Sequence, residues 1–143
     1  MAGVIVVTLA VGIWFFLLRG GGTSEFLDAH ERFVASEQAA EAAMAEVERF
    51  GELETFNAAI DTQRAAMSRQ VTIFNRLAAE EGGEDARLAT DASAAAVTVL
   101  EALGTYASAV LGRHLADAAF ALVQMRDGVA ALDAVVAEWK NLQ

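Results

Sequence analysis

Histidines and paired carboxylates are the residues of this chain best suited to chemistry. Its two histidines are His30 and His114. Bundles that hold two iron ions use a Glu-x-x-His pattern on two helices, but Leu27 stands three residues before His30, and Leu111 three before His114. In a four-helix bundle the two histidines lie roughly 35–40 Å apart by helical rise. We therefore expect both to be boundary or surface residues, not ligands of a shared metal or haem.

Glutamates at helical spacing form two candidate pairs. Glu37 and Glu41 are four residues apart and share one face of a helix, as do Glu48 and Glu52 if the helix continues past Gly51. Such carboxylates can bind a divalent cation or share a proton. Because neither pair has a histidine, a DxD motif or a glycine turn beside it, we interpret both as solvated helix faces. The acidic turn "EEGGED" at 80–85 suits either a basic partner surface or solubility.

Most catalytic repertoires lack their usual parts in this chain. It has no cysteine, which excludes disulfides, thiolate zinc sites and thiol nucleophiles, and it has only one lysine. No nucleophile–base arrangement is visible, and the three glycines at 20–22 lack the lysine of a phosphate-binding loop. We predict a protein that is not an enzyme and that holds no cofactor and no metal.

Small residues in the segment "GTYASAVLG" allow another helix to approach closely. Gly104, Ser108 and Gly112 recur every four residues and so share a helix face. We expect them to serve tight packing inside a bundle, with a docking groove for a partner's helix or a lipid chain as the alternative. Tyr106 lies on a neighbouring face, where it is expected to bury its ring and to need a partner for its hydroxyl.

The elements that position these residues are expected to be α-helices throughout. The 143 residues include 32 alanines and no proline, and alanine is the best helix former while proline is the worst. The formal charge is −10. No basic stripe is present to bind a polyanion, so nucleic acid is disfavoured as a partner. An acidic surface suits solubility or a basic surface on a partner protein.

The first nineteen residues are expected to anchor the chain in a membrane. Residues 2–18 carry no charge, and as a helix they would extend about 25 Å, at the short end for a bilayer core of about 30 Å. Trp14 and Arg19 suit the membrane interface. The segment lacks the basic front and the small-x-small cleavage site of a signal peptide. A signal peptide and a buried core helix are the less favoured interpretations.

Three units follow from this interpretation. They are a single-pass transmembrane anchor at 1–19, a Gly-rich linker at 20–23 and a helical domain at 24–143. The membrane expected is a bacterial-type inner membrane. Charges on the two sides of the apolar segment nearly balance, with one α-amine before it and one arginine after it. The absence of lysine or arginine before the segment favours a cytoplasmic helical domain.

Glycines divide the helical domain at regular intervals. Gly51, the pair Gly82-Gly83 and Gly112 stand 31 and 30 residues apart, and each could end a helix in a left-handed conformation. They predict helices at 24–50, 54–81, 84–111 and 114–142 in an up-down-up-down four-helix bundle. The alternative is a long antiparallel two-helix hairpin folded at Gly82-Gly83.

The composition of residues 92–125 favours the bundle. Its only charged residues are Glu101, Arg113 and Asp117, so the segment needs neighbours on more than one side. A second membrane span there is less favoured, because Glu101 would lie unpaired in hydrocarbon. Apolar residues at seven-residue spacing, or at alternating three- and four-residue spacing, are expected to face the core: Phe26, Phe33, Ala40, Val47, Ile60, Met67, Phe74, Val99, Leu103, Tyr106, Val110, Leu115, Ala118, Leu122, Met125, Val129, Leu132, Val136 and Trp139.

These features predict a protein that works by contact. An anchor, a helical domain and more apolar surface in 92–125 than such a domain easily hides indicate an accessory or scaffolding subunit. It would dock on a larger membrane protein complex, and an energy-transducing complex is one candidate. The alternative is a membrane-tethered sensor, a bundle that binds a small apolar molecule in its core.

Overall fold

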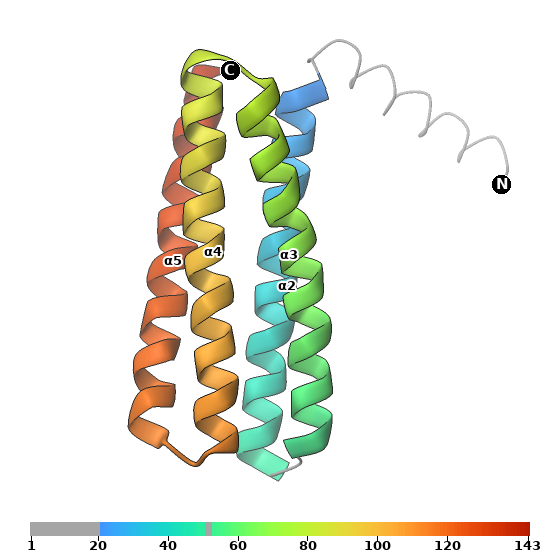
Figure 1. Cartoon of the computed structure of the whole chain (residues 1–143), viewed down its shortest axis with the longest axis vertical. Helices are drawn as coiled ribbons and strands as arrows, with labels where there is room; N and C mark the ends of the chain where they lie inside the picture. The colour runs from blue at the N-terminus through green and yellow to red at the C-terminus, as the bar shows by residue number, and fades with distance from the viewer. Residues whose placement is uncertain (1–20, 51–52) are drawn as a thin grey trace, which may run out of the picture.

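Four helices packed against one another form the part of the chain that the computed structural model describes, residues 21–50 and 53–143. They are α2 (Gly21–Phe50), α3 (Leu53–Glu80), α4 (Gly83–Leu111) and α5 (Leu115–Leu142), and they alternate in direction (Figure 1). The predicted all-α fold with four packed helices is therefore confirmed. Because α2 packs extensively on α3, the alternative of one long two-helix hairpin is wrong. The predicted anchor at 1–19 lies outside the described residues.

The helix boundaries fall within three residues of those predicted. The largest difference is at the start of α2, which begins at Gly21, so that three of the four residues predicted as a linker at 20–23 are helical. The linker was predicted from the poor helix propensity of glycine. Extending a helix that packing has already formed is much easier than nucleating one, so its first turn can include weak helix formers.

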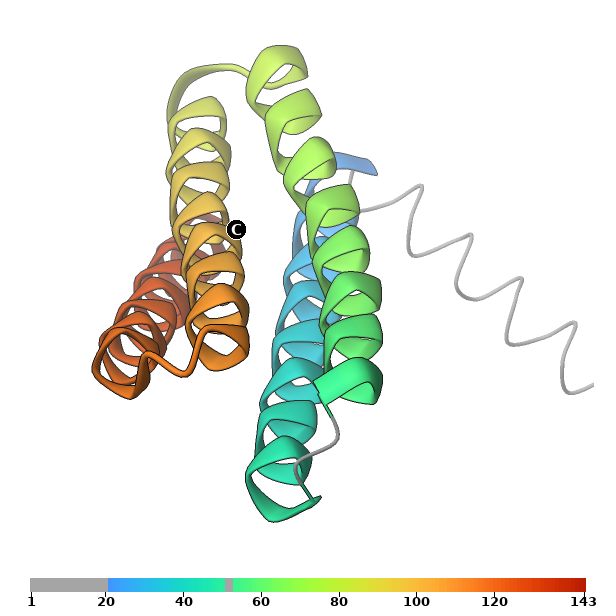
Figure 2. The ribbon, with the colours of Figure 1, turned by 60° about the horizontal axis from the view of Figure 1, so that its bottom comes forward.

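Each helix packs mainly against its neighbours in the sequence. Contacts are extensive between α2 and α3, between α3 and α4 and between α4 and α5, whereas α2 and α5 share few contacts. Figure 2 shows the result as two helix pairs, with α4 and α5 on one side and α2 and α3 on the other. We call the end where α2 begins and α5 ends the upper end, and the end at the α4–α5 turn the lower end (Figure 1).

Aromatic side chains close the core near the upper end. The ring of Phe26 on α2 stacks on Trp139 of α5, with centroids 3.9 Å apart and planes 7° apart, and it meets the ring of Phe74 on α3 at 5.3 Å. All three side chains are fully buried. Such ring contacts add to the stabilisation from buried apolar area, so this cluster ties three helices together.

Close packing of small residues joins α4 to α5. A Cβ atom added to Gly128 would stand 2.7 Å from Cγ2 of Val99 and 3.4 Å from the backbone oxygen of Ala95. Both helices are rich in alanine, and Ala92 and Ala96 of α4 and Ala121 of α5 are fully buried. The two helix backbones therefore approach closely, which a larger residue at 128 would prevent.

The turn between α4 and α5 places a left-handed residue where no glycine stands. Gly112 is right-handed (φ −83°, ψ −2°), and Arg113 has φ +60°. The amide of His114 donates to the carbonyl of Ala109 at 2.8 Å, and that of Arg113 to Val110 at 3.2 Å. This pair of bonds is a Schellman motif with Arg113 at the left-handed position. The expectation that Gly112 itself takes that conformation is wrong, whereas Gly83 at the preceding turn is left-handed (φ +58°).

Among the helices described, α4 alone is long and apolar enough to cross a membrane by length and composition. In the bundle it packs against both α3 and α5, and 44 % of its most apolar window is buried there. The low charge of this segment thus matches a helix with neighbours on two sides, as the sequence predicted.

Candidate functional site

The small residues Gly104, Ser108 and Gly112 do not form one packing stripe. Gly104 faces α3, where a Cβ atom would stand 3.1 Å from Nη2 of Arg64. Ser108 is exposed. Gly112 belongs to the turn, and a Cβ atom there would meet the His114 ring at 2.8 Å. Three residues on one helix face therefore have three different neighbours, which sequence spacing alone does not distinguish.

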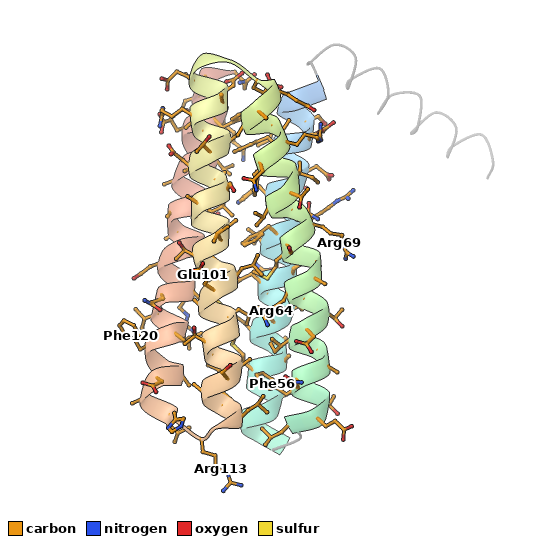
Figure 3. The ribbon with its side chains drawn as sticks, in the orientation of Figure 1. Phe56, Arg64, Arg69, Glu101, Arg113 and Phe120 are labelled. Atoms are coloured by element: carbon orange, nitrogen blue, oxygen red, sulfur yellow. The ribbon has the colours of Figure 1, made fainter. Side chains whose placement is uncertain are left out.

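Tyr106 lies in the core, as its sequence position predicted. Its side chain is buried, and its ring meets that of Phe56 on α3 edge-on, with centroids 6.3 Å apart. This contact fixes α4 against α3 in the lower half of the bundle, where Figure 3 shows Phe56. Tyr106 therefore has a packing role.

Large apolar side chains are exposed near the lower end of the bundle. The exposed fraction is 77 % for Leu115, 64 % for Phe120, 55 % for Val123 and 45 % for Leu111. Leu115 was expected in the core, and this prediction is wrong. It keeps the spacing of the core residues of α5, but it stands in the first turn of that helix, where no neighbouring helix covers it. Phe120 and Val123 fall outside the core spacing, and the sequence analysis did not single them out. The feature of the sequence that could have identified them is a second apolar face on this helix, beside the face already assigned to the core.

A hollow of about 280 Å³ lies between α4 and α5 beside these side chains. It is open to solvent. Its walls are Thr105, Ser108 and Ala109 from α4, His114 from the α4–α5 turn, and Asp117 and Phe120 from α5. We call this hollow, with the outer faces of α4 and α5 next to it, the α4–α5 groove. Figure 3 shows Phe120 projecting from α5 on the outside of the bundle, away from α2 and α3. Ser108 is thus the one member of the predicted small-residue stripe that lines this groove.

A second cluster of polar residues joins α2 to α5. Nε2 of His30 lies 2.8 Å from Oδ1 of Asp133, and Nε of Arg126 lies 3.6 Å from Oε1 of Glu41. Glu37 stands between these two pairs in the sequence of α2 and is only 5 % exposed. The contact between α2 and α5, which has few packing contacts, is thus bridged by ionisable groups.

Glu37 is the strongly perturbed acid of this cluster. Burial, a hydrogen bond with Glu41 and the charge of that carboxylate together raise its pKa from 4.5 to about 7, while Arg126 opposes the shift. The Glu37 carboxyl is therefore about half protonated near neutral pH, and its proton can bond to the Glu41 carboxylate. The interpretation of this pair as a solvated face is wrong for Glu37, because sequence spacing cannot show which neighbouring helix covers that face.

The two histidines lie far apart. His30 lies beside Asp133, and His114 lies at the start of α5, so helical rise separates them by about 28 Å along the bundle. Within residues 21–50 and 53–143, no group of three or more His, Asp or Glu residues is placed to hold a metal ion. His30 is not a simple surface residue, since it is half-buried and bridges two helices.

Acidic residues of the segment at 80–85 pair within the chain. Nη1 of Arg76 binds Oε2 of Glu80 at 3.0 Å, and Nη2 of Arg87 binds Oε2 of Glu84 at 2.8 Å. Arg87 also bridges to Glu138 on α5. Part of the negative charge of this turn is therefore paired within α3 and within α4, which leaves less of it for a basic partner.

The structure does not place several residues that the sequence analysis singled out. Trp14 and Arg19, the expected interface residues, lie outside the described residues, as does Glu52. The side chain of its predicted partner Glu48 is likewise not described.

Comparisons of the chain with models of protein families, with curated proteins and with solved structures find no match.

Proposed function

We propose that this protein is a non-enzymatic, membrane-anchored accessory subunit whose helical bundle docks on a larger membrane protein complex. The observation that carries the proposal is the exposure of Leu111, Leu115, Phe120 and Val123 near one end of the bundle. Isolated apolar residues on a surface are common, but four large ones gathered near one turn are typical of an interaction site. The uncharged segment 2–18 supports the membrane anchor.

The position of these side chains defines where docking takes place. α2, which follows the predicted anchor in the sequence, begins at the upper end, and the exposed residues lie near the lower end, beside the α4–α5 turn (Figure 1). A helix of 28 residues such as α5 is about 42 Å long. If the bundle stands upright, the partner must present its binding surface some tens of ångströms from the bilayer, on an extramembrane domain.

Membrane fractionation and native sizing test the proposal. The full chain should remain with membranes after alkaline extraction. In mild detergent it should migrate as part of an assembly much larger than its 15.1 kDa. The double variant Phe120→Ser/Val123→Ser should remain in the membrane and lose the large assembly. As a matched control, Thr62→Ala changes an exposed residue of α3 and should keep the assembly.

Two results would overturn the proposal. One is a chain that fractionates with the aqueous phase. The other is a wild-type chain that migrates as a lone monomer after gentle extraction from its native membrane.

A further inference from the structure

The α4–α5 groove combines apolar side chains with carboxylates that have no cation beside them. Glu101 on α4 and Asp117 and Asp127 on α5 are exposed. In the described part of the chain, no lysine, arginine or histidine lies within ion-pair distance of these three carboxylates. The nearest cations in the sequence point elsewhere. Arg126 reaches Glu41 on α2, and Arg113 extends beyond the lower end of the bundle (Figure 3).

The three carboxylates surround the apolar centre of the groove. Asp117 forms part of the wall of the hollow beside Phe120. Asp127 follows Phe120 by seven residues, which places it on the same helix face about 10 Å towards the upper end. Glu101 stands one helical turn before Thr105, another residue of the hollow, and Figure 3 shows it on α4. A partner that covers Phe120 therefore meets negative charge on several sides.

We infer that the α4–α5 groove binds an amphipathic helix of the partner, one that carries arginine or lysine beside its apolar residues. This inference deepens the proposed docking function and rests on it. Leucine-sized side chains of the partner helix cover Phe120 and Val123, and its cations pair with Glu101, Asp117 and Asp127. Helices of this kind bind grooves through apolar residues at positions i, i+3, i+4 and i+7.

The shape of the groove favours a helix. Two antiparallel helices present a furrow between them, and the residues that line its α4 side are small: Thr105, Ser108 and Ala109. Small residues let a third helix approach closely. The hollow accepts one long side chain, whose methylene stem can lie on the Phe120 ring while its charge reaches Asp117. Charge complementarity of this kind sets partner choice and association rate.

Binding of model helical peptides tests the inference. The full chain is reconstituted in nanodiscs of zwitterionic lipid and titrated with a fluorescent peptide in which leucine repeats at i, i+3, i+4 and i+7 and lysine fills the polar positions. A matched peptide carries glutamate in place of lysine. Empty nanodiscs give the background. The cationic peptide should bind at least tenfold more tightly than the anionic one, and Phe120→Ser should weaken its binding at least tenfold.

Two triple variants separate the groove from the overall charge of the chain. Glu101→Gln/Asp117→Asn/Asp127→Asn should weaken binding of the cationic peptide at least tenfold. The control removes three exposed carboxylates elsewhere, Glu31→Gln/Glu46→Gln/Asp61→Asn, with the same change in net charge, and should weaken binding less than threefold. Far-ultraviolet circular dichroism checks that both variants remain folded.

Several outcomes would overturn the inference. Equal losses from the two triple variants would show general attraction to an acidic protein. Equal binding of the anionic peptide would show that charge plays no part. Concentration-dependent self-association abolished by Phe120→Ser would assign the groove to a second copy of this chain. The membrane-fractionation experiment is independent of these results, so failure of the membrane-anchored docking function can be distinguished from failure of the partner chemistry.

Discussion

Towards its C-terminus α5 buries Leu132, Val136 and Trp139, whereas its first three turns expose Leu115 and Phe120. The two halves belong to one helix with the same alanine-rich composition. They differ in their neighbours: in the upper half Trp139 stacks on Phe26 of α2, which in turn meets Phe74 of α3, whereas no helix covers Leu115 and Phe120 in the lower half. The apolar content of a helix therefore indicates that part of its surface must be buried. Whether this chain buries that surface itself depends on which of its helices lie beside it.

Shortening a large buried side chain in the upper half of α5 should have the largest effect on stability. Trp139→Ala removes a fully buried ring that stacks on Phe26, so we expect a loss of about 3–5 kcal/mol in the free energy of unfolding. Phe120→Ala is the matched change in the lower half and should cost less than about 1 kcal/mol, because that ring is already exposed. Urea denaturation followed by circular dichroism measures both. Similar losses from the two variants would contradict the contrast between the halves.

The cluster between α2 and α5 should make stability depend on pH. Glu37 titrates near 4.5 when unfolded and near 7 when folded, so the folded chain binds the extra proton between these values. The stabilisation from this group is present below pH 4.5 and is lost as pH rises through 7. Glu37→Gln, which resembles the protonated acid, should therefore be more stable than wild type at pH 8, by up to about 3 kcal/mol.

The comparison is the difference in unfolding free energy between wild type and Glu37→Gln, measured from pH 4.5 to 8. This difference reports Glu37 together with its coupling to the charged groups at the same contact, which are His30, Glu41, Arg126 and Asp133. Glu41→Gln serves as the control, because it removes the charge and the carboxylate partner that raise the pKa of Glu37, and the pH dependence should move to lower pH. A pH-independent difference would remove Glu37 from this role.

Substitutions at two glycines compare a tight helix contact, at Gly128, with a looser one, at Gly104. Gly128→Ala places a methyl group against Val99 and should destabilise the protein by about 1–3 kcal/mol. At Gly104 the new methyl group meets only the flexible end of the Arg64 side chain. Gly104→Ala should therefore stabilise by up to about 1 kcal/mol through helix propensity. Thermal unfolding of both variants measures the difference, and the same sign for both would show that α4 lies equally close to α3 and α5.

The α4–α5 turn should yield the smallest change. Arg113 adopts a left-handed conformation that costs most residues free energy, and glycine adopts it freely. Arg113→Gly should raise the free energy of unfolding by about 0.5–1 kcal/mol. Arg113→Ala keeps the backbone cost and should bring no gain, so it distinguishes relief of this conformation from loss of the charge. The measurement is again chemical denaturation.

The four helices could be predicted because their signals are local. Alanine content, the absence of proline and glycines near 51, 82 and 112 act within a few residues of each helix end. The burial of Glu37, the close approach at Gly128 and the exposure of Leu115 depend on which helix lies opposite, which spacing within one helix does not show. Arg113 shows a local limit, because the sequence offers a glycine one residue before the position that needs it.

Packing of each helix on its neighbours in the chain has a consequence for how the molecule forms. Most tertiary contacts join segments that are close in sequence, and chains with such local contacts fold in microseconds to milliseconds. During synthesis α2 and α3 can pair before α5 has left the ribosome. The side of α4 that packs on α5 then stays exposed until α5 has been made. In that interval the nascent chain is most exposed to aggregation.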